Sequence, residues 1–267
     1  MRSFKLRARA GALIESIGRI YDAYPDVNGI AVSMPGIIDS ANGHVIMGGA
    51  LEYNDFYFKN ALYKRCPVKI AVNNDAKCAA SAEAKLGALK DVGDGVVLLF
   101  GTMIGGGIVI DHKVRKGIHC SAGEVSYILT DRAADPLYET VWGNRNGIPM
   151  LCRYFARKKG LPEEEVDGIR VFEAVNSGDK EAIEVLNDFA KEIAVQIFNL
   201  QTVLDMERFA IGGESALSRC LLTASDTIWK RCMRHLRIMF HEPRLLHVNT
   251  GMMRTLSVRY RSIWHLK

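Results

Sequence analysis

The stretch NNDAKCAASAEAKLG, residues 73–87, places a carboxylate where a predicted strand meets a predicted helix. Asp75 follows the β-branched run VKIAV and the polar pair Asn73-Asn74. A carboxylate at the carboxyl end of a strand in an α/β fold can accept a proton from a ligand hydroxyl, and Asn74 could hydrogen-bond a neighbouring hydroxyl. The alternative is that Asp75 only caps the helix that begins here. The motif alone leaves both interpretations open.

The stretch LLFGTMIGGGIVID, residues 98–111, has four glycines between two apolar runs. It contains neither GxGxxG before a helix nor GKS/T, which excludes the dinucleotide fingerprint and the P-loop. We predict a glycine turn between two strands, where missing Cβ atoms let backbone N–H groups face an anion and Thr102 adds a hydroxyl. The pattern fits a plain hairpin as well as a phosphate-binding turn.

Two shorter motifs complete the candidate set. Glu124 lies in SAGEVSY between small residues that would let a ligand approach, although a solvated surface carboxylate fits the same pattern. The pair Gly212-Gly213 is either a strand-to-helix turn or a place where a flat ring passes close to the backbone.

Hydrophobic periodicity predicts the elements that must position these residues. Apolar residues at helical spacing predict a helix over 12–24, ending before Pro25, and a longer one over 179–204. Short apolar runs predict buried strands; these runs are VNGIAVSM before Pro35-Gly36, VKIAV, VVLLF, IVI and ERFAIGG. Two α/β units separated near residue 90 follow from this order.

Composition limits the class of protein. The chain has 267 residues and 48% hydrophobic residues, enough for a sizeable core. No apolar run is long enough to cross a bilayer and the start lacks a secretory pattern, so we expect a cytoplasmic protein. No two cysteines form a CxxC pair, which speaks against a close-spaced zinc site or redox motif; the six are Cys66, Cys78, Cys120, Cys152, Cys220 and Cys232.

Positive charge is concentrated at the end of the chain. Residues 214–267 hold ten Lys/Arg against three Asp/Glu, so of the net charge of +5 they contribute +7 and residues 1–213 contribute −2. The same segment holds four of the seven histidines and two of the three tryptophans. A nucleic-acid-binding arm is one interpretation, and a reading-frame change or truncated gene copy is another.

The motifs taken together resemble the ROK family of sugar kinases and repressors. The resemblance covers roughly residues 12–213 and depends on the order PG, NNDAKCAASAEAKLG, LFGTMIGGGIVID, GxxxSAGE and AIGG. It implies an α/β fold of the actin-like, hexokinase-like (ribonuclease H-like) type, here N-terminally truncated, with sugar and ATP bound between two domains. We expect a remnant of the sugar-binding domain at 1–90, the nucleotide-binding domain at 91–213 and a divergent basic tail at 214–267.

The resemblance also assigns roles to individual residues. Asp75 aligns with the catalytic base that deprotonates the sugar hydroxyl. Residues aligned with sugar contacts or the lining of the sugar pocket are Gly36, Asn74, Glu124 and Tyr127. Residues aligned with phosphate and adenosine contacts are Gly101, Thr102, Gly105, Gly106, Gly107, Gly212 and Gly213. The implied ligands are ATP, Mg²⁺ and a hexose, N-acetylhexosamine or β-glucoside, and the implied assembly is a homodimer.

The sequence departs from the family pattern in two ways. The D-x-G-G-T phosphate loop that opens the family occurs nowhere in the chain, so we expect impaired phosphoryl transfer. Tyr127 stands where the family commonly has a zinc-binding His, and no cysteine-rich motif follows. This pattern is similar to a zinc-free subgroup that includes β-glucoside kinases, N-acetylmannosamine kinases and glucokinase-like proteins, so we expect no zinc. A non-catalytic sugar-sensing regulator and an inactive gene remnant remain the alternatives.

Overall fold

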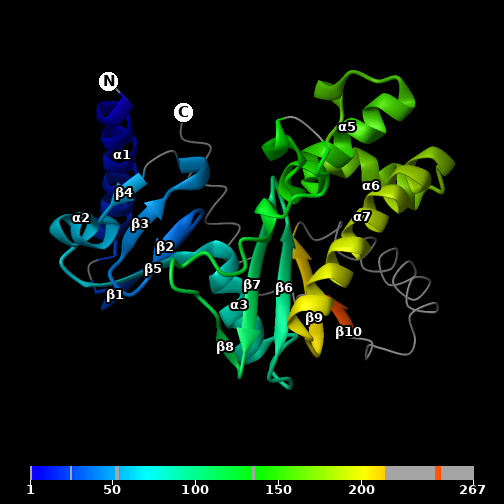
Figure 1. Cartoon of the computed structure of the whole chain (residues 1–267). Helices are drawn as coiled ribbons and strands as arrows, with labels where there is room; N and C mark the ends of the chain where they lie inside the picture. Colours follow the sequence, from blue (N-terminus) through cyan, green and yellow to red (C-terminus); the bar gives the residue numbers. More distant parts are fainter. Residues whose placement is uncertain (1, 25, 52–53, 134–135, 214–243, 248–267) are drawn as a thin grey trace. The chain divides into compact units, whose positions relative to one another are not determined.

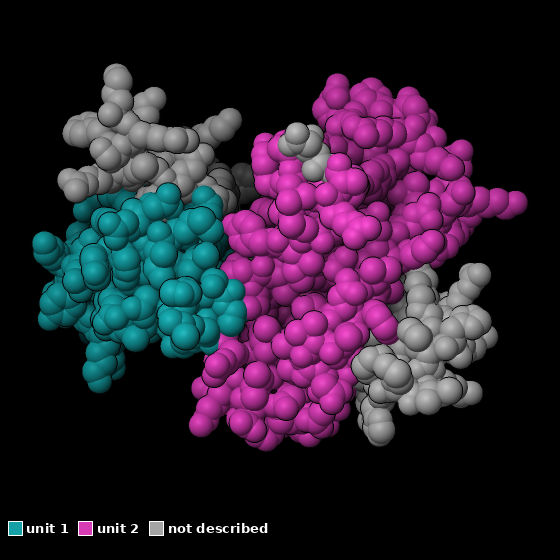
Figure 2. Space-filling view, viewed as in Figure 1, with its two compact units in different colours: residues 1–78, 116–122 teal, residues 79–115, 123–267 magenta. Residues whose placement is uncertain are grey.

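The computed structural model describes residues 2–24, 26–51, 54–133, 136–213 and 244–247. The chain forms two compact units, shown in teal and magenta in Figure 2: unit 1 comprises residues 1–78 and 116–122, and unit 2 comprises residues 79–115 and 123–267. The first division falls inside a helix rather than near residue 90. The functional domain boundaries at 90 and 213 therefore stay a prediction.

Unit 1 is built around the predicted strand, turn and helix. Strand β1 (Gly29–Met34) pairs in parallel with β5 (Lys69–Asn74), and the register places Met34 opposite Asn74. Helix α3 (Asp75–Leu86) follows β5 without a break. The carboxyl ends of both strands therefore lie at one edge, with Pro35-Gly36 following one strand and Asp75 the other.

A second, antiparallel sheet completes unit 1. Its strands are β2 (Ile37–Asp39), β3 (His44–Met47) and β4 (Asn54–Phe56), with the 3₁₀ turn η1 (Gly49–Leu51) before β4. Helices α1 (Arg2–Asp22) and α2 (Phe58–Arg65) contribute to a core shared with both sheets. Burial of this apolar surface is what holds such short strands in place; buried members are Ala10, Ile14, Met34, Ile38, Val45, Phe58, Leu62, Cys66, Ile70 and Val72.

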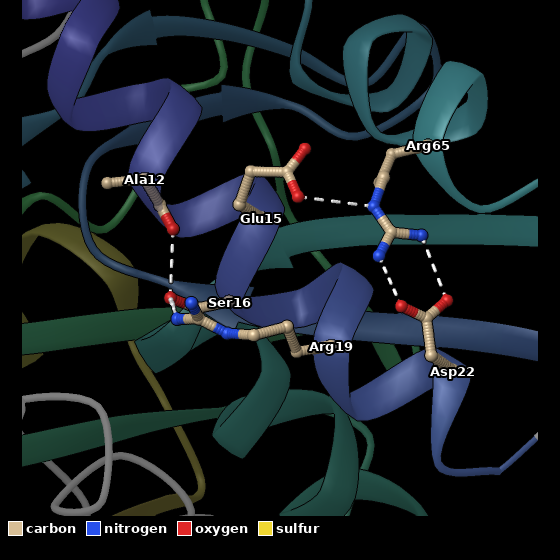
Figure 3. A network of polar contacts seen from close by, with 6 residues as sticks. All are labelled: Ala12, Glu15, Ser16, Arg19, Asp22 and Arg65. Atoms are coloured by element: carbon tan, nitrogen blue, oxygen red, sulfur yellow. Dashed lines mark hydrogen bonds and ion pairs between the residues drawn. The ribbon is translucent and has the colours of Figure 1, made fainter.

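Arg65 at the end of α2 binds two carboxylates of α1 (Figure 3). Its Nε donates to Glu15 Oε2 at 3.3 Å and its Nη1 to Asp22 Oδ1 at 3.0 Å, and Nη2 also contacts Asp22. The guanidinium holds the pKa of Asp22 below its usual range, mainly through this side-chain hydrogen bond. Gly18 lies under the guanidinium, because a Cβ there would be 2.6 Å from Arg65 Cζ. The two helices are thus joined by a forked ion pair that packs over a glycine.

Unit 2 contains a five-stranded sheet in the order β10-β9-β6-β7-β8 (Figure 1). The strands are β6 (Gly95–Phe100), β7 (Ile104–Ile110), β8 (Lys113–Val114), β9 (Arg208–Gly213) and β10 (Arg244–His247). Strand β6 is antiparallel to β7 and parallel to β9, and Phe100 lies opposite Gly213. The hairpin end of β6 and the end of β9 therefore share one edge of the sheet.

Side chains of β6 alternate between two cores, as the period of a strand requires. Val96, Leu98 and Phe100 pack in the larger core with the helices that follow β8, whereas Val97 packs in a smaller core with Ala80 and Ala84 of α3. The helices on the larger side are α4 (Trp142–Asn146), α5 (Ile148–Lys159), α6 (Gly168–Asn176) and α7 (Lys180–Leu204), with 3₁₀ turns η2 (Val125–Tyr127), η3 (Leu137–Thr140) and η4 (Glu163–Glu165). Both faces of the sheet are covered.

The predicted elements agree with this fold, with two differences in detail. The helix predicted over 179–204 is confirmed as α7, and the helix predicted over 12–24 is part of α1, which begins at Arg2. The glycine turn is shorter than predicted, because Gly105–Gly107 belong to strand β7. The predicted basic tail lies outside the described residues except for β10. No helix in the described ranges is long and apolar enough to span a bilayer.

Candidate functional site

Asp75 is held at the carboxyl edge of the β1–β5 sheet. Its Oδ1 accepts hydrogen bonds from the backbone N–H of Ala76 at 2.8 Å and from the Asn74 amide at 3.1 Å. The side chain remains accessible to water, yet nearby protein raises the pKa of its carboxyl, because desolvation outweighs these two hydrogen bonds, a third from the backbone N–H of Asp75 itself, and the charge of Lys77. Accessibility and desolvation are compatible here, since a water-contacting carboxyl can still lie among many low-dielectric atoms.

The helix cap is Asn74, not Asp75. The Asn74 Oδ1 accepts from the backbone N–H of Lys77 at 3.0 Å, three residues on, as the side chain of an N-cap residue does. Its amide also donates to the carbonyl of Gly36 at 3.0 Å, so this side chain joins the Pro35-Gly36 turn to Asp75. Asn74 is buried, and both amide hydrogens are engaged. The N-cap of α3 therefore lies one residue earlier than the sequence interpretation placed it, and the catalytic role of Asp75 stays a prediction.

Gly36 occupies a conformation that favours glycine. Its φ is +108°, and a Cβ there would be 2.9 Å from the carbonyl carbon of Gly48 and would overlap the carbonyl oxygen of Met47. The chain can therefore turn from β1 into β2 beside Asn74 only with a residue that lacks a side chain. The candidates of unit 1, which are Gly36, Asn74 and Asp75, are connected by hydrogen bonds or chain continuity.

The glycine turn of unit 2 consists of Gly101, Thr102 and Met103. The Gly101 N–H donates to the Met103 carbonyl at 2.9 Å, and the Gly101 carbonyl accepts from the N–H of Ile148, the first residue of α5, at 2.8 Å. Within the part of the chain that the structure describes, no protein group accepts a hydrogen bond from the N–H of Thr102 or Met103. The turn thus presents two backbone donors next to the N-terminus of a helix, an arrangement suited to an anion.

The triple glycine has a different function from the turn. Gly106 and Gly107 are buried in β7, and Gly105 is half-buried. A Cβ on Gly106 would overlap the carbonyl oxygen of Gly123 and lie 2.9 Å from a methyl carbon of Val125. Close packing of two backbone segments, rather than turning, therefore explains the glycine at 106.

Gly212 and Gly213 end β9 beside the glycine turn. Gly212 pairs with Leu99 and Gly213 with Phe100, the residue that precedes the turn. Gly213 has φ +133°, and a Cβ there would be 3.0 Å from Phe100 N and would overlap its carbonyl oxygen. Sheet register thus brings two candidate motifs, more than a hundred residues apart in the sequence, to one edge of the sheet.

Glu124 and Tyr127 bracket the 3₁₀ turn η2. The N–H of Tyr127 donates to the carbonyl of Glu124 at 3.2 Å, so both side chains come from one turn of chain. The Tyr127 side chain is 53% exposed, whereas Glu124 is half-buried. The buried Ser126 between them could not be predicted from the sequence, because a single serine among apolar residues carries no capping or turn signal.

No cluster of three or more His, Cys, Asp or Glu side chains that could hold a metal ion is present among the described residues. A Mg²⁺ ion that arrives with a nucleotide does not need such a cluster. It binds through one or two carboxylates and otherwise through phosphate oxygens and water. The backbone donors of the glycine turn in unit 2 are of the kind that hold the phosphates of such a complex.

Comparisons with known proteins show the family of this chain. A family model described as ROK family matches residues 7–248, a longer range than the sequence motifs covered. A beta-glucoside kinase of Klebsiella pneumoniae is 33% identical over 195 residues, which are 72% of this chain and 65% of the relative. An N-acetyl-D-glucosamine kinase of Aliivibrio salmonicida is 29% identical over 254 residues, 89% of this chain and 82% of the relative. The chain thus spans about 65% of the length of the first curated relatives it matches.

Solved structures give the same fold. The Lmo2764 protein of Listeria monocytogenes matches with a TM-score of 0.75 at 27% identity, over 90% of this chain and 81% of its own. A ROK family glucokinase of Streptomyces griseus, solved with glucose and AMPPNP, matches with a TM-score of 0.80 at 20% identity, over 90% and 83% of the two chains. The fold is therefore the predicted α/β fold of the actin-like, hexokinase-like type.

Proposed function

The chain belongs to the ROK family, and on that premise we propose that it transfers the γ-phosphoryl group of ATP to a hydroxyl of a sugar. The observation that carries the proposal is the Asp75 carboxyl, the first residue of α3, held by Asn74 and Ala76 at the carboxyl edge of two parallel strands. Ligands of open α/β sheets bind at such edges. A single base and well-placed donors suffice for phosphoryl transfer.

Asp75 acts as the general base in this proposal. Its ionised carboxyl accepts the proton of the sugar hydroxyl, the hydroxyl oxygen forms a bond to the γ-phosphorus, and the bond from that phosphorus to the bridging oxygen of ADP breaks. Desolvation raises the pKa of Asp75 and so makes its carboxylate a stronger base than an ordinary aspartate. The Asn74 amide fixes the orientation of the carboxylate.

The phosphates are held by unit 2. The N–H groups of Thr102 and Met103, which have no acceptor among the described residues, favour negative charge at the turn, as do the Thr102 hydroxyl and the nearby N-terminus of α5. We assign the adenosine to Gly212 and Gly213, which end β9 beside the turn. Mg²⁺ bound with ATP would neutralise part of the phosphate charge. Gly105, Gly106 and Gly107 support the turn from within β7.

We assign the sugar to Glu124, Tyr127 and the Gly36 turn. Asn74 is better described as supporting the Gly36 turn and Asp75, because both of its amide hydrogens are bonded to these two residues. Relatives named beta-glucoside kinase, N-acetyl-D-glucosamine kinase and glucokinase favour a hexose, an N-acetylhexosamine or a β-glucoside.

We also propose that the protein is a homodimer without structural zinc. Sedimentation analysis should therefore give twice the mass of one chain, and elemental analysis should find less than one zinc per two chains.

The test is ATP-dependent phosphorylation of a sugar panel. Glucose, N-acetylglucosamine, N-acetylmannosamine and a β-glucoside such as cellobiose are incubated with the full chain and Mg²⁺-ATP, and the sugar phosphates are identified by mass spectrometry. Phosphorylation of one class above the rest supports the proposal. Sugar binding without any phosphorylated product would contradict it.

The pH dependence of kcat/KM should show the raised pKa of Asp75. A base works only when ionised, so activity should fall as the pH decreases through that pKa, at a higher pH than an ordinary aspartate would give.

Asn74→Asp keeps the oxygen that caps α3 but replaces the amide donor with a second negative charge, while Lys77 stays the nearby cation. The acid limb should therefore move to still higher pH. A limb unchanged in this variant would show that the titrating base is not Asp75.

A further inference from the structure

Ser126 joins two segments of unit 2 through one buried hydroxyl. The side chain lies in the middle of η2 and is 6% exposed. Its Oγ accepts a hydrogen bond from the N–H of Ile104 at 3.0 Å and donates one to the carbonyl of Ile104 at 2.6 Å. Both backbone polar groups of one residue are thus satisfied by a single side chain.

Ile104 and Ser126 each lie next to residues with proposed roles. Ile104 is the first residue of β7 and follows the glycine turn directly. Ser126 is flanked within one turn of chain by Glu124 and Tyr127. The hydroxyl therefore connects the turn assigned to phosphate with the segment assigned to the sugar.

The Ser126 hydroxyl is closely packed on the side of α4. Gly143 of α4 packs against both segments, because a Cβ there would be 2.6 Å from Ser126 Oγ and 2.6 Å from the terminal methyl of Met103. Removing the hydroxyl would take away the side-chain oxygen that lies between the two segments. The backbone groups of Ile104 would then lose their partner, which is costly for buried groups.

We propose that Ser126 is a positioning residue that sets the glycine turn and the Glu124–Tyr127 segment in a fixed relation, so that sugar and phosphate are held in register. The proposal rests on the proposed sugar kinase function. It assigns Ser126 no contact with either ligand. Its effect on turnover passes through the two segments it connects.

The first experiment needs no ligand. Amide hydrogen exchange is measured by mass spectrometry on wild type, Ser126→Ala and the matched control Thr140→Val. Thr140 is likewise buried, and its hydroxyl bonds the carbonyls of Asp131 and Leu137, away from the turn. We expect faster exchange in both 101–104 and 124–127 for Ser126→Ala alone. Unchanged exchange in either segment would overturn the proposal.

The second experiment separates positioning from general loss of structure. Ser126→Ala should raise KM for ATP and KM for the sugar together and lower kcat/KM at least about tenfold, because small misplacements of reacting groups are costly. Thr102→Ala should raise only KM for ATP, Glu124→Gln only KM for the sugar, and Thr140→Val neither. Faster exchange in Ser126→Ala with both KM values unchanged would refute the positioning role. If wild type transfers no phosphoryl group, the proposed function fails, and the exchange result alone decides whether Ser126 couples the two segments.

Discussion

Asp75→Asn should reduce kcat by about 10³-fold while leaving the fold intact, because a positioned general base contributes roughly 10²- to 10⁴-fold to proton transfer. The amide keeps an oxygen that can accept the Ala76 N–H bond now made at 2.8 Å, so the geometry of the α3 start is preserved. Only the ability to accept the proton of the sugar hydroxyl is lost. KM for ATP should stay near the wild-type value, since the residues that we propose to bind the nucleotide lie on other elements.

The stability of this variant supplies the internal control. Desolvation raises the pKa of Asp75 in the folded protein. Ionisation at neutral pH therefore lowers the free energy of unfolding, and this loss disappears only below the pKa of the unfolded chain. A neutral amide removes the penalty, so the Tm of Asp75→Asn should equal or exceed that of wild type at pH 7. Lost activity with retained stability would separate a catalytic carboxyl from a structural one.

A matched variant guards against a general effect of removing a carboxylate. Asp188 lies exposed on α7, and Asp188→Asn should leave kcat and KM unchanged. If kcat of Asp75→Asn stayed within about threefold of wild type, the carboxyl would contribute only about 0.7 kcal/mol to transition-state stabilisation. That is far below what a general base supplies. Such a result would remove Asp75 from its proposed role.

Gly106→Ala should lower the free energy of unfolding by about 3 kcal/mol, at the upper end of the range for overpacked cores. The added methyl would overlap the carbonyl oxygen of Gly123 and lie 2.9 Å and 3.1 Å from the two methyl carbons of Val125. Gly123 cannot retreat freely, because its own φ is +81° and its Cα faces the Gly106 carbonyl. Relief requires movement of a backbone segment rather than rotation of a side chain.

The same movement should impair sugar binding. Glu124 follows Gly123 directly, so displacement of this backbone shifts the carboxylate assigned to the sugar. We expect a higher KM for the sugar in Gly106→Ala than in wild type under conditions where both are folded. Urea unfolding at one pH, followed by kinetics at low temperature, measures both effects.

Gly11→Ala provides a control of opposite sign. Gly11 lies inside α1, and a Cβ there would have no atom within 4 Å. Alanine is favoured over glycine in a helix by about 0.5–1 kcal/mol, so this variant should be more stable than wild type. Equal stability of Gly106→Ala and wild type would contradict the close approach of the two backbone segments.

The amino-acid sequence determined the local elements and the chemistry of the candidate residues. Apolar spacing was enough for α7, and the change from β-branched residues to alanines was enough for the junction between β5 and α3. These signals are local, because the period of side-chain exposure in a helix or strand is written in consecutive residues. The ordered motifs also identified the family, which the match over residues 7–248 supports.

The tertiary structure decided what each polar group and glycine does. Only Gly101 of the four glycines lies in the turn, while Gly106 makes room for Gly123, and Asn74 rather than Asp75 caps α3. Gly213 lies beside the turn because β9 pairs with β6 in a register that places Gly213 opposite Phe100. Ser126 is connected to the turn by its hydrogen bonds to Ile104. These partners are distant along the chain or depend on the exact residue at which a strand ends. Residue type and spacing specify which kinds of group a side chain can bond to. Sheet register and packing determine which partner lies next to it.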